Sequence, residues 1–152
     1  MWENEPLTKT FCHFRLEWFN VSRALTLVGD LKGRISVLDF FTYCCINCMH
    51  ILPDLECLED KHPPENGEVL VVGVHSAKFE NERVSANIEA AIQKYDIHHP
   101  VVNDSQAKLW KHLGISCWPT LLILACGLTC TLTLQHVVYL HFYTSLCSLP
   151  PP

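Results

Sequence analysis

Charged side chains are missing from the last part of the chain. All 11 basic and 16 acidic residues lie within the first 112 of the 152 positions, and none occurs from Leu113 to Pro152. A globular α/β domain normally carries charged residues on the outer faces of its last elements. We therefore expect one domain over residues 1–124 and an atypical tail over residues 125–152 that either completes a sheet or is poorly ordered.

Basic clusters are also missing. The formal net charge is −5, and no basic stripe interleaved with aromatic residues occurs, so nucleic acid is not an expected partner. The start, MWENEPLTKT, lacks the basic and then apolar profile of a secretory signal, which favours a cytoplasmic location. The apolar span from Leu121 to Phe142 approaches transmembrane length, but polar residues interrupt it, and we expect no membrane association.

Cysteine, in contrast, is abundant. The chain has nine cysteines, three of which fall within five positions in FFTYCCINCMHILPD, residues 40–54. Nine is an odd number for a domain stapled by disulfides, and in the cytoplasm a CxxC pattern indicates redox or metal chemistry before a structural disulfide. The pattern predicts a site at Cys45 and Cys48, with Cys44 as an additional neighbouring thiol.

Apolar runs predict three buried strands. Two cover residues 34–41 (RISVLDFF) and 68–76 (EVLVVGVHS), and the third follows Pro119 in CWPTLLIL. Gly127 could turn this third strand into a hairpin with LTCTLTL. Because helices are expected between the strands, the order of elements indicates an α/β layered domain.

The helices are predicted from apolar spacing and capping residues. The first follows the cysteines, and Pro53 inside it predicts a kink. The second is expected over Glu80–Ile97, with Val84 on its apolar face. The third is short, with Asp104 as its N-cap and Gly114 at its end.

The spacing of Cys45 and Cys48 suits thiol–disulfide exchange. With Cys45 at the first turn of a helix, Cys48 follows one turn later on the same face, and the two Cα atoms lie within roughly 5–6 Å, as a disulfide requires. The helix N-terminus stabilises an anion, so the Cys45 thiolate is favoured. Cys45 is therefore the predicted nucleophile and Cys48 the resolving thiol.

Two further groups would complete such a site. Cys48 has to lose a proton while it is buried, and Asp39, in the middle of a buried strand, is the candidate acid and base. A backbone edge has to hold the substrate chain, and Trp118, Pro119 and Thr120 at the start of a strand can supply it if the proline bond is cis.

These residues together carry a family resemblance. Asp39 stands six residues before Cys45. Pro53 stands five residues after Cys48, and Pro119-Thr120 follows downstream. The chain thereby resembles the thioredoxin-like superfamily, in its TlpA-like branch, where a strand with an Asp is followed by WCxxC, a kinked helix and a cis-Pro motif.

The resemblance extends over about residues 14–124 and is sharpest to the amino-terminal domain of NHL-repeat proteins, in which a β-propeller follows. It implies a three-layer α/β/α domain with a central mixed sheet. It also implies protein or small disulfide substrates and no cofactor or metal, because the dithiol itself cycles. Cys44 replaces the usual tryptophan, and the charge-free tail looks like an alternative carboxyl terminus of a truncated isoform.

Two other functions stay open. One is a thioredoxin-like interaction module that binds a partner without catalysis. The other is a zinc site, for which the chain offers a CxxC and a CxxxC pair together with two histidines. These candidate zinc ligands are Cys45, Cys48, Cys126, Cys130, His50 and His75.

Overall fold

The computed structural model describes residues 16–26, 30, 34–63, 69–125 and 128–133. Its strands are β1 (Glu17–Phe19), β2 (Ile35–Phe41), β3 (Val69–His75), β4 (Val101–Asn103), β5 (Thr120–Ala125) and β6 (Leu128–Thr133). Its helices are α2 (Ile46–Lys61), the 3₁₀ helix η3 (Glu80–Arg83), α3 (Ser85–Lys94) and α4 (Lys108–His112).

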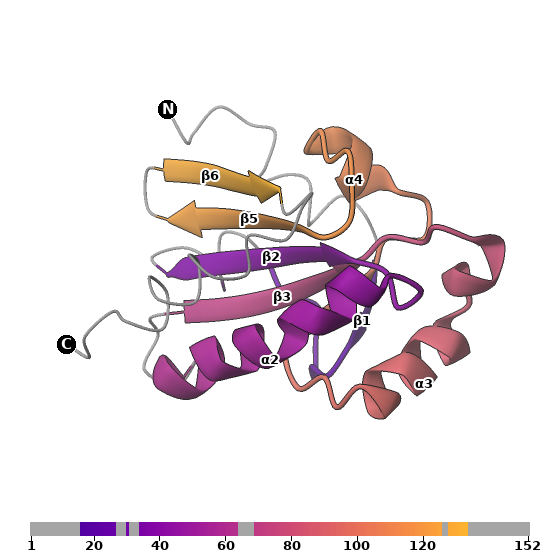
Figure 1. Cartoon of the computed structure of the whole chain (residues 1–152), viewed down its shortest axis with the longest axis horizontal. Coiled ribbons are helices and arrows are strands. Elements are labelled where there is room, and N and C mark those ends of the chain that lie inside the picture. The colour runs from indigo at the N-terminus through magenta and orange to yellow at the C-terminus, as the bar shows by residue number, and fades with distance from the viewer. Residues whose placement is uncertain (1–15, 27–29, 31–33, 64–68, 126–127, 134–152) are drawn as a thin grey trace.

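The strands form one mixed sheet in the order β1-β4-β3-β2-β5-β6 (Figure 1). The central strands β4, β3 and β2 are parallel to one another, while β1, β5 and β6 pair antiparallel with their neighbours. The predicted α/β class with a central mixed sheet is therefore confirmed. The strands predicted at residues 34–41 and 68–76 are β2 and β3, and the strand after Pro119 is β5.

Helices cover both faces of the sheet (Figure 1). Alternate residues of a strand point to opposite faces. On one face, Val37 and Val71 pack against the buried side of α2, and Phe41 packs in a cluster with Ile88 of α3. On the other face, residues such as Leu38 pack with Leu109 of α4. The resulting three layers position the start of α2 over the end of β2.

The predicted helix over Glu80–Ile97 is wrong in its first part. Residues Glu80–Arg83 form η3, Val84 is extended and 50% exposed, and only then does α3 begin. The physical reason is Glu82, whose carboxylate accepts hydrogen bonds from the backbone and from Thr42 on the sheet side. These bonds tie the segment to the interior, so Val84 cannot join an apolar helical stripe.

The prediction of Asp104 as the N-cap residue is wrong, because the helix starts later and Ala107 is its N-cap, but Asp104 still accepts the first backbone N–H groups of the helix. Asp104 Oδ1 accepts the backbone N–H groups of Lys108 and Leu109, at 2.7 and 3.1 Å. Ala107, with φ of 51°, precedes the first helical residue. Gly114 follows the helix with φ of 67°, a left-handed conformation that glycine adopts without steric cost.

The short edge strand β1 and the three-residue β4 were not predicted, because three residues carry too little periodicity to be recognised. The backbone of β6, within the predicted tail, pairs with β5 from Thr120 opposite Thr133 to Ala125 opposite Leu128. Gly127 and residues 134–152 lie outside the described residues. No helix in the described part of the chain is long and apolar enough to cross a membrane.

Candidate active site

Cys45 is the N-cap residue of α2. Its backbone is extended, with φ of −104° and ψ of 111°, and its carbonyl accepts the N–H groups of Cys48 and Met49 at 3.1 and 3.2 Å. Its own N–H donates to the carbonyl of Thr42 at 3.1 Å, which closes the turn between β2 and α2. The half-buried Cys45 thiol therefore lies at the positive end of a 16-residue helix.

Cys48 lies in a different environment. Its side chain is 0% exposed and packs in a cluster with Phe41, Ile88 and Val101. Burial raises the pKa of the Cys48 thiol far above its ordinary value, and a hydrogen bond to Cys45 raises it further. Both sulfurs are free thiols. The pair thus combines one accessible sulfur with one that is shielded from solvent.

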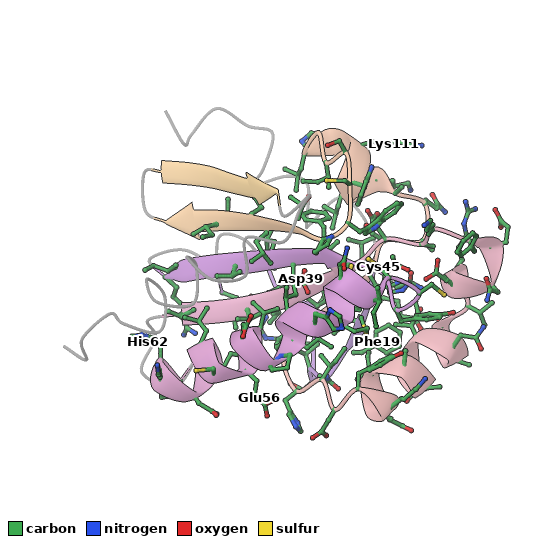
Figure 2. All side chains as sticks on the ribbon, viewed as in Figure 1. Phe19, Asp39, Cys45, Glu56, His62 and Lys111 are labelled. Atoms are coloured by element: carbon green, nitrogen blue, oxygen red, sulfur yellow. The ribbon has the colours of Figure 1, made fainter. Side chains whose placement is uncertain are left out.

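Asp39 lies in β2 on the face covered by α2. It is 0% exposed, and neither carboxylate oxygen has a hydrogen-bond partner in the described structure. Burial raises the pKa of Asp39 to about 8, and its charge raises the pKa of Cys48. In Figure 2, Asp39 and Cys45 lie toward the same end of the sheet. A buried carboxyl group without a partner is costly in a core, which points to a chemical role.

The peptide bond between Trp118 and Pro119 is cis. The Trp118 indole N–H donates to the carbonyl of Ser76 at 3.1 Å, and its ring lies 4.4 Å from that of Trp110. Trp118 and Cys45 both pack against the cluster that contains Cys48. Thr120 is buried, and its hydroxyl donates to the carbonyl of Cys117 at 2.8 Å, so the hydroxyl already has a partner in its own loop.

Sequence reasoning missed Glu82. Its side chain is fully buried, and it accepts hydrogen bonds from the Thr42 hydroxyl and, at 3.3 Å, from the backbone N–H of Cys44. The opposite oxygen accepts the N–H groups of Lys78 and Phe79 at 2.7 and 2.8 Å. A Glu three residues into a helical turn is a capping signal, but the sequence gives no sign of its contact with a segment 38 residues away.

His75 forms part of the wall beneath the turn. Its ring stacks on Tyr43 at 5.2 Å and meets Phe41 edge to face at 5.2 Å. Burial lowers the pKa of His75 to about 4, so the imidazole is neutral. Among the residues that the structure describes, no group of three or more His, Cys, Asp and Glu side chains is arranged to hold a metal ion. Of the candidate zinc ligands, Cys126 and the side chain of Cys130 lie outside the described part of the structure.

The two histidines in the turn before β4, His98 and His99, differ in exposure. His98 is exposed beside Asp96, with 3.3 Å between Nε2 and Oδ1. His99 is buried, with Nδ1 3.4 Å from Oε2 of Glu59 on α2. The reason is that the turn leads directly into β4, so its last side chain is drawn under α2.

The fold and the position of the cysteines define a class. A family model described as thioredoxin-like matches residues 33–127, and the chain belongs to this family. NHL repeat-containing protein 2 of Bos taurus is 53% identical over 123 residues, which are 81% of this chain and 17% of that protein. The chain therefore spans less than a fifth of the length of this relative.

Two further comparisons concern a named oxidoreductase and the fold itself. Sporulation thiol-disulfide oxidoreductase A of Bacillus subtilis is 29% identical over 93 residues, covering 61% of this chain and 54% of that protein. The crystal structure of the thioredoxin-like superfamily protein SPOA0173 superimposes with a TM-score of 0.66 at 23% identity, covering 90% and 94% of the two chains. The predicted resemblance is confirmed, and the domain is related to thiol–disulfide oxidoreductases.

Proposed function

We propose that this domain exchanges thiols and disulfides through Cys45 and Cys48. The observation that carries the proposal is the contrast within the pair: the N-cap residue of α2 has a half-buried thiol, and a fully buried thiol follows one turn later, near a buried carboxyl group without a hydrogen-bond partner. An attacking sulfur needs access to the substrate, whereas a resolving sulfur needs protection from it.

The reaction proceeds in two transfers at sulfur. The Cys45 thiolate attacks a substrate disulfide, forms a mixed disulfide and releases one substrate thiolate. In the minority of molecules whose Asp39 is ionised near neutral pH, Cys48 then gives its proton to Asp39 and attacks the Cys45 sulfur, which releases the second substrate thiolate and leaves a Cys45–Cys48 disulfide. The two electrons lost by the protein thiols reduce the substrate, and each released thiolate takes up a proton.

The substrate would lie beside the start of α2. Trp118 packs against the same cluster as Cys45, and it is followed by Pro119 at the entrance to β5. We propose that these two residues contact the backbone of an extended protein or small disulfide substrate. Thr120 would act by holding the loop, since its hydroxyl is bound to Cys117. A cytoplasmic place of action, where thiols stay reduced, is part of the same proposal.

A single-turnover assay tests this function. The reduced chain is mixed with glutathione disulfide, and the protein and its thiols are followed by mass spectrometry. Cys45→Ser should abolish reduction of the disulfide, because the attacking sulfur is gone. Cys48→Ser should stop at a mixed disulfide on Cys45.

Cys57→Ser is the matched control, because Cys57 is a half-buried thiol on the same helix that forms no disulfide and lies outside the pair. It should reduce glutathione disulfide at the rate of the wild type. Equal rates for Cys45→Ser and the wild type would contradict the proposal.

An interaction module without turnover is the second candidate. It is favoured by the strong burial of Cys48, which raises its thiol pKa and slows resolution. In that case the wild type, like Cys48→Ser, would stop at the mixed disulfide.

A further inference from the structure

We propose that Glu82 is a positioning residue of the loop formed by residues 42–45, which we call the dithiol loop. Glu82 holds Thr42 and Cys44 in place and keeps the Cys44 thiol protonated. Cys45 is therefore the sulfur that attacks. The inference rests on the proposed thiol–disulfide exchange and adds its choice of nucleophile. Three cysteines in five positions make that choice a real problem, because Cys44 is exposed beside Cys45.

The Glu82 carboxylate connects two segments of the chain through hydrogen bonds. One carboxylate oxygen accepts the Thr42 hydroxyl and the Cys44 N–H, and the other accepts the N–H groups of Lys78 and Phe79. Interaction with the same carboxylate also raises the pKa of the Cys44 thiol. Bonds to a carboxylate are stronger than neutral ones, and this side chain is fully enclosed. The dithiol loop is thereby fixed to the segment that follows β3.

The charges around Cys44 favour its protonated form. Partial burial raises the pKa of Cys44, the hydrogen bond and charge of Glu82 raise it further, and only Lys78 opposes them. Burial opposes ionisation of Glu82, but its hydrogen bonds to Thr42 and the backbone outweigh that effect and lower its pKa, so it is an anion. Tyr43 and His75 also face Glu82, and burial keeps both neutral.

A Cys44 thiolate would compete with Cys48 for the Cys45 sulfur. It could attack the Cys45 sulfur of the mixed disulfide, form a Cys44–Cys45 bond and release the substrate thiolate with the same two electrons. Adjacent Cα atoms lie about 3.8 Å apart, below the roughly 4.4–6.8 Å that disulfides usually span, so the product would be strained. A Cys44 that remains a thiol attacks slowly, because the thiolate is the reactive form.

The test compares the reduced wild type with Glu82→Gln. Alkylation by iodoacetamide is followed at Cys44 by mass spectrometry across a pH series. Without the carboxylate, the pH profile of the alkylation rate at Cys44 should shift to lower pH. Alkylation should be roughly two- to fivefold faster near neutrality, as expected for one exposed charge interaction. During oxidation by glutathione disulfide, disulfides that contain Cys44 should increase at the expense of the Cys45–Cys48 pair.

Asp104→Asn is the matched control. Asp104 is another buried carboxylate that accepts three backbone N–H groups, but none from the dithiol loop. It should leave the Cys44 profile unchanged. In a Cys44→Ala background, Glu82→Gln should form no additional disulfides within the CxxC segment, because the competing sulfur is absent.

An unchanged Cys44 profile in Glu82→Gln, or an equal shift in Asp104→Asn, would overturn the inference. If Glu82→Gln does not fold, Thr42→Val provides a second test, because it removes one hydrogen-bond donor to Glu82. This variant should also increase the fraction of disulfides that contain Cys44. An unchanged disulfide pattern in Thr42→Val would then overturn it. The proposed function is judged separately, by pairing of Cys45 with Cys48 in the wild type.

Discussion

Cys45 and Cys48 are the same residue type three positions apart, yet their surroundings give them different chemistry. Cys45 caps the helix and is half-buried, whereas Cys48 is enclosed by apolar side chains of β2, β4 and α3. The difference arises from helix geometry, since one turn moves the second sulfur from the end of α2 to its sheet-facing side. Substituting either cysteine should therefore stop the reaction at a different step.

Asp39 should destabilise the fold at neutral pH. Its folded pKa of about 8 lies above the unfolded value near ~3.9. Below the unfolded value Asp39 is protonated in both states, and its ionisation does not change the free energy of unfolding. As pH rises from about 4 to about 8, the unfolded chain releases the proton while the folded chain retains it, so the free energy of unfolding falls.

Asp39→Asn should remove that pH dependence. We expect a gain of roughly 2–4 kcal/mol in the free energy of unfolding near neutral pH and a much smaller gain near pH ~4. The same variant should slow resolution of the mixed disulfide by Cys48. Urea denaturation at several pH values measures the first effect, and the glutathione disulfide assay measures the second.

Asp60→Asn is the control for this prediction, because Asp60 is exposed on α2. Its unfolding free energy should follow the wild type at every pH. Parallel pH profiles for Asp39→Asn and the wild type would show that Asp39 does not remain protonated in the fold.

At the scale of elements, strands could be predicted from long apolar runs, whereas contacts between residues far apart in the sequence could not. β2 and β3 are near-continuous stretches of Val, Leu and Phe, and burial on both faces of a central strand requires such runs. The start of α3 was misplaced because Glu82 bonds to Thr42, 40 residues earlier in the chain. Helical periodicity reports only local spacing, so it cannot reveal that partner.

The residues of the candidate site also fall into a group that could be predicted from the sequence and a group that could not. Cys45, Cys48 and Asp39 were predictable, because a CxxC at a helix start and an acid inside an apolar strand are unusual within their own segments. Glu82 was not predicted, and His75 was named only as a candidate zinc ligand, because each lies in a segment that is unremarkable by itself. Their proximity to the dithiol loop follows from the parallel pairing of β2 with β3, which brings Phe41 beside His75.

Packing of α2 on the sheet should depend on its buried stripe. Leu55 is buried in a cluster with Val37 and Val71. Leu55→Ala leaves a cavity there and should lower the free energy of unfolding by about 2–5 kcal/mol. The neighbouring Glu56 is exposed, and Glu56→Ala should change it by less than ~0.5 kcal/mol. Urea denaturation of both variants provides the measurement, and equal effects would contradict the packing described for α2.

At the scale of the whole molecule, the layers bring the site together at one end of the sheet. β2 supplies Asp39, the N-cap and first turn of α2 supply Cys45 and Cys48, and the segment after β3 supplies Glu82. The end of β2 and the start of α2 lie together in Figure 1. The chain spans less than a fifth of its NHL repeat-containing relative from Bos taurus, so the substrates and partners of that larger protein are not assigned to it. The division at residue 124 stays a prediction.

One measurement tests the central claim most directly. The purified chain is equilibrated across a series of glutathione redox buffers, and every cysteine is mapped by mass spectrometry. The account predicts that Cys45 and Cys48 oxidise together and reversibly in one two-electron step, with the other cysteines still reduced. Independent oxidation of the two, or scrambling with Cys44, in the wild type would contradict it.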